Sequence, residues 1–497
     1  MTYSMVDYAD VQGLVRFGYG RMTSASYALV RVKNAAAAKA WLRAAPVTNA
    51  VEKRPPPTTA LQIAFTAPGL TQLGLPPSVM EGFSREFRTG MTRDFRTRLL
   101  GDVDHNAPQQ WHWGGPENEP HLLVMFFAEP EHFDSFVQST KGETWSDAFE
   151  KEIWLGTSNL DGVEPFGFAD GISQPQIDWD QQRQTPCTQL EYTNIVALGE
   201  FLLGYRNEYG KITDRPLLHP EAANAELLTA VDAPEKKDLG RNGTYLVMRQ
   251  LEQHVPEFWK FLYAHASGNL AEAGQLGAKM VGRTQAGDPL VPIQAESISG
   301  TEPRTVKQNQ FTYEADPAGA RCPFGAHIRR ANPRNSDFPE RRIGALRKLI
   351  IILGFGPKGF YDDLISSVRF HRILRRGREY GSELSPERAL QQAPPTEPRG
   401  IHFICLNANI SRQFEFLQNA WIGNTKFSGL TGESDPLLSN HTPISGSSVT
   451  GNFTIPSEST LRHRISGLRQ FITVKGGAYF FLPSLRALRY FAGSQSP

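Results

Sequence analysis

The sequence contains few cysteines and no excess of charge of either sign. Its three cysteines, Cys187, Cys322 and Cys405, are widely spaced and form no C-x-x-C pair, so we expect structural thiols instead of a disulfide framework or a zinc site. The 52 basic and 51 acidic side chains nearly cancel. The chain therefore has no overall field that would attract nucleic acid or an anionic membrane, and we expect neither partner.

Long hydrophobic runs are missing as well. The run LLVMFFA at residues 122–128 is far shorter than the roughly 18 apolar residues that span a bilayer, and it indicates a core strand. The N-terminal residues MTYSMVDYADVQG show neither a basic segment followed by an apolar one nor a twin arginine. No export signal is visible, so a cytoplasmic location is the expectation.

The residues that are present indicate a globular protein with more than one core. The 497 residues are 40% hydrophobic and 21% charged, which is ordinary for a folded chain with two to three domain cores. Residues 25–32 alternate like a half-buried strand, and residues 35–45 have helical composition. Strand patterns follow at 59–66 and 121–128, the latter leading into a helical pattern at 131–140. This order predicts a ferredoxin-like half.

A second unit of the same kind begins at residues 243–266 and continues at 400–421, again with a strand before a helix. Polar residues and prolines dominate residues 178–242, which indicates an elaborated connection. We therefore predict an α+β fold of two ferredoxin-like halves, with antiparallel sheets and peripheral helices. The expected N-terminal half covers residues 1–238, and the expected C-terminal half covers residues 239–497.

One histidine stands out by its surroundings. Residues 321–334, RCPFGAHIRRANPR, place His327 among basic side chains that suit an anionic cofactor. A single histidine is by default a structural or surface residue, because imidazole is amphipathic and is readily satisfied by ordinary hydrogen bonds. His327 departs from this default only because two further motifs accompany it.

The two further motifs are a glycine-rich loop with one carboxylate and a dense basic run. Residues 371–381, HRILRRGREYG, contain Arg375. Alone, the loop would indicate an Asx turn, and the basic run a solvated helix face or a nucleic-acid patch. The loop lies in residues 165–176, PFGFADGISQPQ, and its members are Gly167, Phe168, Asp170 and Gly171.

In this order the three motifs resemble the dye-decolorizing peroxidases, a haem enzyme family with a GxxDG loop, a downstream proximal histidine and a distal arginine. The resemblance covers most of residues 9–486, and Arg375 follows His327 by nearly fifty residues, as in the longer-chain branch of the family. It implies a fold related to the dimeric α+β barrels, with the haem bound by the C-terminal half. Further matching segments are DVQGLVRFGYGR, GEFLLGYRNEYG, GIHFICLNANISRQFEF and FITVKGGAYFFLPS.

The resemblance also implies which residues surround the iron. One haem b per chain would be ligated by His327 through Nε2, and Asp435 would accept a hydrogen bond from Nδ1 of the same ring. An aspartate before a proline is otherwise an ordinary turn signal. On the opposite face Asp170 would act as the general base and Arg375 would stabilise negative charge on the departing oxygen. Arg376 is the competing choice for the arginine.

Further pocket residues follow from the same resemblance. Gly167 and Gly171 would let the loop backbone approach the macrocycle. Ile401 and Phe403 match an apolar roof over the distal site, where family members commonly carry leucine and phenylalanine. The other expected pocket residues are Phe168 in the loop and, as partners of the anionic haem propionates, Arg329 and Arg334.

The resemblance implies a peroxidase in which hydrogen peroxide generates a ferryl porphyrin radical that oxidises phenols or bulky dyes in one-electron steps. Large donors would pass electrons through surface side chains, for which Trp421, Trp259 and Tyr380 are candidates by chain proximity. An aspartate beside an arginine stays ionised well below neutral pH, so we expect an acidic optimum for dye oxidation. The alternatives are a haem-binding or haem-handling protein without significant peroxidase turnover and, third, a metal-free binding module.

Overall fold

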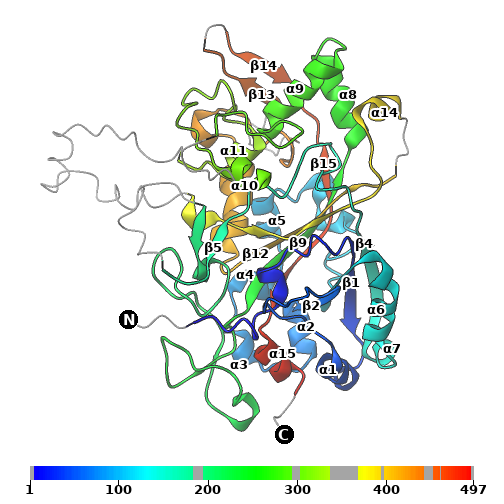
Figure 1. The fold of residues 1–497 in the computed structure, drawn as a ribbon, viewed down its shortest axis with the longest axis vertical. Coiled ribbons are helices and arrows are strands. Elements are labelled where there is room, and N and C mark those ends of the chain that lie inside the picture. The colour runs from blue at the N-terminus through cyan, green and yellow to red at the C-terminus, as the bar shows by residue number, and fades with distance from the viewer. Residues whose placement is uncertain are drawn as a thin grey trace, which may run out of the picture.

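The centre of the molecule is an antiparallel sheet. The computed structural model describes residues 5–182, 194–293, 303–335, 368–392, 397–441, 451–458 and 461–493 (Figure 1). In these residues nine strands form one sheet of order β10-β12-β9-β15-β2-β3-β1-β4, in which β11 also pairs with β12. Cys322 and Cys405 are buried free thiols, whereas Cys187 lies outside the described residues. No helix in the described ranges is long and apolar enough to cross a membrane.

The N-terminal part of the sheet has the ferredoxin-like order β2-β3-β1-β4. Successive residues of β3 face two different cores, Leu122 with Val124 on one side and Leu123 with Met125 on the other, which explains the unbroken apolar run. The elements in chain order are β1 (Ser24–Val32), α1 (Ala35–Ala44), β2 (Thr59–Phe65), β3 (Leu122–Ala128), α6 (Phe133–Lys141) and β4 (Phe149–Gly156). The predicted strand-helix-strand-strand-helix order is confirmed.

The C-terminal part repeats this order, with β10 and β11 at the edge, followed by β12, β9 and β15. The two parts join where Phe481 of β15 pairs with Phe65 of β2. The predicted α+β fold of two ferredoxin-like halves is thus confirmed. The elements are β9 (Thr244–Gln253), α8 (Val255–His265), α9 (Leu270–Val281), β10 (Leu374–Arg375), β11 (Arg378–Tyr380), β12 (Gly400–Asn407), the π-helical segments η10 (Ser411–Glu415) and η11 (Leu417–Ile422), and β15 (Ile472–Leu482).

Shorter elements surround the sheet. In its described residues the connection at 178–242 contributes very short strands and two short 3-10 helices, in agreement with its weak periodicity. The short helices are α2 (Ala67–Gln72), α3 (Pro77–Met80), α4 (Arg85–Thr89), α5 (Asp94–Leu100), α7 (Trp145–Ala148), α10 (Arg304–Asn309), α11 (His327–Ala331), α14 (Pro386–Gln391) and α15 (Leu485–Phe491). The short strands are β5 (Gln176–Asp178), β6 (Ile195–Ala197), β7 (Leu217–Leu218), β8 (Lys237–Asp238), β13 (Asn452–Ile455) and β14 (His463–Ser466).

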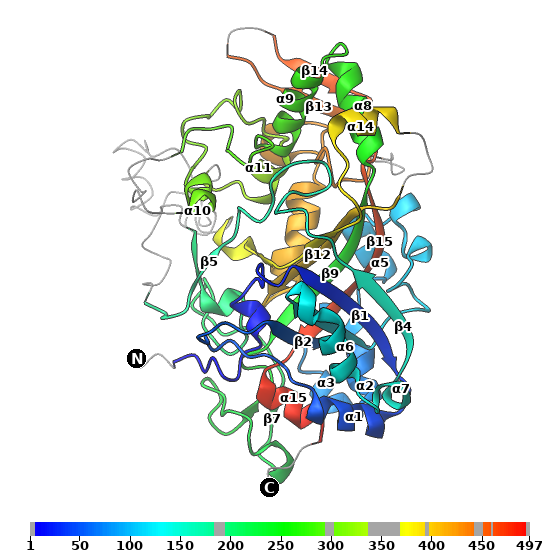
Figure 2. The same ribbon diagram turned by 45° about the vertical axis from the view of Figure 1, so that its right-hand side comes forward.

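The two halves exchange segments. Figures 1 and 2 both place α15, the C-terminal helix, among α1, α2 and α3 of the N-terminal half. There the ring of Phe491 lies 5.6 Å from the ring of Phe65. In the other direction, Arg96 of α5 forms a buried 2.6 Å ion pair with Glu415 of η10. The predicted boundary near residue 238 falls at the end of β8 and stays a prediction.

The sheet curls so that its two edges approach each other. The backbone N–H of Ser158, just after β4, donates to the carbonyl of Glu379 in β11 at 2.8 Å. Nε2 of His402 in β12 lies 3.0 Å from the carbonyl oxygen of Gly156 in β4. The inner faces of both halves therefore share one apolar core, whose members include Tyr27, Leu29, Met125, Phe127, Met248, Ile404, Leu406 and Phe480.

Candidate active site

A cavity of about 250 Å³ opens beside the C-terminal half of the sheet. Six parts of the chain supply its polar groups: the loop at 164–173, the end of β9, Arg283 just after α9, α11 with the residue that follows it, the segment 371–375 and η11. Apolar side chains form most of the remaining wall. These include Phe166, Phe168, Ile172, Leu251, Val281, Ile401, Phe403, Phe414, Leu417, Ile422, Leu437 and Ile472.

His327, the first residue of α11, presents its ring to this cavity. Its Nδ1 lies 2.9 Å from Oδ2 of Asp435, a fully buried carboxylate. Because an ionised carboxylate only accepts hydrogen bonds, Nδ1 carries a proton, and in the neutral ring Nε2 keeps its lone pair. No other hydrogen bond to this ring occurs in the part of the chain that the structure describes, so Nε2 is available as a ligand.

Asp435 is held in place by backbone groups. Its Oδ1 accepts the N–H groups of Leu437 and Leu438, each at 2.9 Å. Burial alone would raise the pKa of the Asp435 carboxyl, but His327 and these N–H donors outweigh burial and keep that pKa below its ordinary value. Burial lowers the pKa of His327, and the charge and hydrogen bond of Asp435 outweigh it, so that this pKa is raised.

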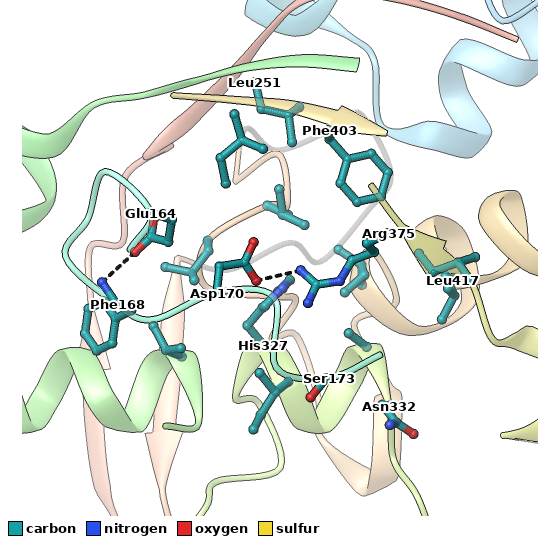
Figure 3. Close-up of a pocket in the computed structure, with 18 of the residues that line it drawn as sticks. Glu164, Phe168, Asp170, Ser173, Leu251, His327, Asn332, Arg375, Phe403 and Leu417 are labelled. Atoms are coloured by element: carbon teal, nitrogen blue, oxygen red, sulfur yellow. Dashed lines mark hydrogen bonds and ion pairs between the residues drawn. The ribbon is translucent and has the colours of Figure 1, made fainter. Parts of the chain in front are cut away.

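Asp170 and Arg375 form an ion pair that faces the same cavity. Nη1 of Arg375 donates to Oδ1 of Asp170 at 2.7 Å. Figure 3 shows this pair and the ring of His327 pointing toward one space. Burial would raise the pKa of the Asp170 carboxyl, yet the charge and hydrogen bond of Arg375, followed by a hydrogen bond from the Gly171 N–H, hold it below its ordinary value. Asp170 is therefore an ionised base.

The loop that carries Asp170 is fixed by its own backbone and by Glu164. The half-buried carboxylate of Glu164 accepts the N–H groups of Phe166 and Phe168, each at 3.0 Å. Gly167 has a φ of 94° and Gly171 a φ of 76°, so both positions favour glycine. These two glycines shape the loop, and they are not among the residues that line the cavity.

Three arginines expected near the cofactor lie elsewhere. Arg329 is buried and donates to Oδ2 of Asp316 at 3.0 Å, and Arg334 donates to the carbonyls of Asn309 and Phe311. Both hold the segment around His327 and do not line the cavity, because carboxylate and carbonyl groups beneath that segment take up their guanidinium groups. The expectation that they pair with propionates needs correction. Arg376, the competitor of Arg375, donates to the carbonyls of Leu14 and Val15.

Sequence reasoning missed several residues of this site. Arg283 and Arg372 line the cavity together with Arg375. Glu164 directly precedes the motif at residues 165–176 and Gln174 lies inside it, so their positions in the sequence could have identified them as site residues. Ile401 and Phe403 do line the cavity from β12, and Phe168 lines it from the loop. The electron-transfer candidates Trp259, Trp421 and Tyr380 are all buried.

The residues present fit a haem group. A flat apolar macrocycle suits a wall of aliphatic and aromatic side chains, and an available imidazole Nε2 suits an iron atom. The ionised Asp170–Arg375 pair lines the same cavity, where peroxide could be bound and a proton moved. The donor set and the apolar lining together match the cofactor that the sequence motifs implied.

Comparison with known proteins shows what the chain is similar to. No family model matches the chain. It is 27% identical over 510 aligned positions to a dye-decolorizing peroxidase of Exidia glandulosa, covering 98% of this chain and 87% of that protein. A multifunctional dye peroxidase of an Amycolatopsis species is 30% identical over 354 residues, covering 68% of this chain and 63% of that protein.

A solved structure agrees with these relatives. The crystal structure of a dye-decolorizing peroxidase from Auricularia auricula-judae matches with a TM-score of 0.70 and 27% identity, covering 98% of this chain and 100% of that one. A curated dye-decolorizing peroxidase of that organism is 29% identical over 451 residues, covering 87% of this chain and 75% of that protein. The molecule is thus a peroxidase. Over most of its length it is similar to the dye-decolorizing peroxidases.

Proposed function

We propose that the chain binds one haem b through His327 and uses hydrogen peroxide to oxidise phenols or dyes in one-electron steps. The observation that carries this proposal is the arrangement in one cavity of an available imidazole Nε2 and an ionised Asp170–Arg375 pair. Bound haem would supply an iron atom that binds peroxide and stores oxidising equivalents. The chain's own residues bind the cofactor, move one proton and stabilise charge.

The proton moves through Asp170. Its carboxylate would take the proton from one oxygen of hydrogen peroxide and return it to the other oxygen, which leaves as water, and bound haem would supply the two electrons that breaking the O–O bond consumes and would keep the remaining oxygen atom. The guanidinium of Arg375 stabilises the negative charge that develops on the departing oxygen and keeps Asp170 ionised between turnovers. Asp435 orients the ring of His327 and increases its electron donation through Nε2.

The anionic groups of the cofactor need different partners from those expected. Arg372 lines the cavity, and we assign a propionate to it in place of Arg329 and Arg334, whereas Arg283 donates to the carbonyls of Gly287 and Gln308. The donors follow from the relatives, which are named for dye oxidation, and from one related structure that was solved with 2,6-dimethoxyphenol. The cytoplasmic location stays a prediction.

The alternative, a haem-binding protein without peroxidase turnover, is not favoured. Cofactor storage needs an iron ligand and an apolar pocket, but it needs no ionised carboxylate paired with an arginine on the cavity wall. Asp170 and Arg375 are held together at 2.7 Å at that wall, which is an arrangement for proton transfer.

The substitution Asp170→Asn tests the proposal. Asparagine keeps the shape of the side chain but cannot accept a proton, so we expect peroxide consumption to fall by about 100-fold or more, with unchanged haem loading. Asp161→Asn is the matched control, because Asp161 is exposed and lies at the start of the same loop. Equal rates for Asp170→Asn and the unmodified protein would refute the proposed role.

A further inference from the structure

The side-chain amide of Gln174 connects the Asp170 loop to β10. Oε1 of Gln174 accepts the backbone N–H of Arg375 at 3.1 Å, and Nε2 of Gln174 donates to the carbonyl of Arg375 at 3.1 Å. Gln174 follows Asp170 by four residues, and the side chain of Arg375 returns to Asp170 at 2.7 Å. The backbone from Asp170 to Gln174, the two amide hydrogen bonds and the ion pair therefore close a ring that includes both side chains proposed for peroxide chemistry.

The position of β10 explains why an amide is needed there. β10 is only two residues long and pairs with β12 through Leu374 with Leu406 and Arg375 with Cys405. The N–H and C=O of one strand residue point to the same side, and those of Arg375 point away from β12 toward Gln174. Among side chains, only glutamine and asparagine offer a neutral donor and acceptor spaced like a peptide group. Within the described residues, Gln174 thus takes the place of a neighbouring strand.

The backbone at Gln174 and its neighbour Ser173 is itself held by hydrogen bonds from other segments. The carbonyl of Gln174 accepts from Nδ2 of Asn309 at 3.3 Å, and the hydroxyl of the adjacent Ser173 accepts from Arg283 at 2.9 Å. The carbonyl of Arg375 also receives Nη1 of Arg376 at 3.3 Å, so Gln174 supplies only one of two donors there. Its bond to the Arg375 N–H has no such substitute in the described residues.

We propose that Gln174 is a positioning residue that holds the backbone of Arg375 at the distance at which its guanidinium reaches the carboxylate of Asp170. The inference rests on the proposed function for its kinetic consequence. Without the amide, β10 keeps its pairing with β12 and the contact of Arg376 with the Arg375 carbonyl, but the Arg375 N–H loses its partner in the described residues and the Arg375 side chain loses its fixed origin. The ion pair would then form for only a fraction of the time.

The consequence for Asp170 follows from the charges around it. The loop carries Glu164, α11 carries His327, β10 carries Arg375 and β11 carries Glu379. Of the groups that lower the pKa of Asp170, Arg375 contributes most, and burial opposes it. Weakening the contact with Arg375 therefore raises the pKa of Asp170, so that the base becomes protonated at a higher pH.

The first experiment needs no cofactor. Gln174→Met keeps the length of the side chain and removes both hydrogen bonds, and Gln176→Met is the matched control, because the exposed side chain of Gln176 has no hydrogen-bond partner in the described ranges. The Asp170 carboxyl would be titrated by NMR in cofactor-free protein with labelled aspartate, its signal assigned by its loss in Asp170→Asn. We expect a higher pKa in Gln174→Met only.

The second experiment measures peroxide consumption by the haem-loaded proteins across pH. For Gln174→Met we expect the acidic limb to move to higher pH, with a loss of about tenfold at acidic pH and less than about threefold at neutral pH. If Gln174→Met does not fold, Gln174→Asn carries the same test, because its shorter amide cannot reach the backbone of Arg375.

The inference is overturned if Gln174 has a merely structural role. In that case Gln174→Met has a lower melting temperature, but the titration of Asp170 and the acidic limb of the pH profile stay as in the unmodified protein. The two proposals fail in different ways. If the unmodified haem protein does not consume peroxide, the proposed function fails, whereas the carboxyl titration still decides whether Gln174 positions Arg375.

Discussion

Replacing Asp435 by asparagine should weaken haem binding through the tautomer of His327. In the unmodified protein Oδ1 of Asp435 is occupied by the N–H groups of Leu437 and Leu438, and Oδ2 accepts Nδ1–H of His327. Asparagine would keep Oδ1 on the two backbone donors and so turn its NH₂ group toward Nδ1. Two donors cannot share one hydrogen bond, so the ring would move its proton to Nε2. The atom proposed to bind iron would then lack its lone pair.

The size of the effect follows from this geometry. Loss of a hydrogen-bond partner behind a metal-ligating histidine typically costs 10- to 100-fold in affinity, which is about 1.4 to 2.7 kcal/mol. We expect this range, because the partner is fully buried and cannot be replaced by water.

The pH dependence of haem affinity should change too. His327 must lose a proton to bind iron, and removing the charge of Asp435 lowers its pKa, so haem affinity should persist to lower pH in the variant.

The assay is a haem titration of the cofactor-free protein followed by absorbance at several pH values. Asp238→Asn is the control, because Asp238 is a buried carboxylate paired with Arg215 that does not line the cavity. It should lower stability and leave haem affinity unchanged. Wild-type haem affinity and pH dependence in Asp435→Asn would refute the reasoning.

Three further predictions concern the distal side, the loop and the seam of the sheet. Arg375→Met should slow peroxide consumption by about 100-fold and move the acidic limb of its pH profile to higher pH, because burial would then raise the pKa of Asp170. Arg376→Met is the control and should affect mainly stability. Similar kinetics for both variants would contradict this prediction. Phe168→Ala should cost about 3–5 kcal/mol in chemical denaturation, because Phe168 is buried, while Phe95→Ala at an exposed position should cost less than about 1 kcal/mol. Burial lowers the pKa of His402 from 6.5 to about 4, so the unfolded chain takes up its proton first and stability falls by about 3 kcal/mol as pH drops from 6.5 toward 4. Denaturation of His402→Gln at a series of pH values should show a smaller fall, and an unchanged fall would exclude this cause.

Much of the fold was predictable because its signals are local. The alternation at residues 25–32 and the helical composition at 35–45 are properties of neighbouring residues, and they became β1 and α1. The unbroken apolar run at 122–128 predicted a core strand, and the structure shows that each of its faces meets a different core. The exchange of α15 and α5 between the halves had no such signal, because it depends on where distant segments pack.

The candidate site divides in the same way. The sequence predicted His327, Asp170 and Arg375 through the resemblance of three motifs, taken together and in order, to the dye-decolorizing peroxidases, and the same resemblance selected Asp435, an aspartate before a proline, as the second carboxylate. Only the tertiary structure decided that Asp435 reaches Nδ1 across 108 residues, that Gln174 reaches Arg375 across 201, and that Arg329 turns to Asp316 instead of the cavity. A charged side chain binds whichever partner packing brings within hydrogen-bonding distance, and that choice is made by segments far apart in the chain.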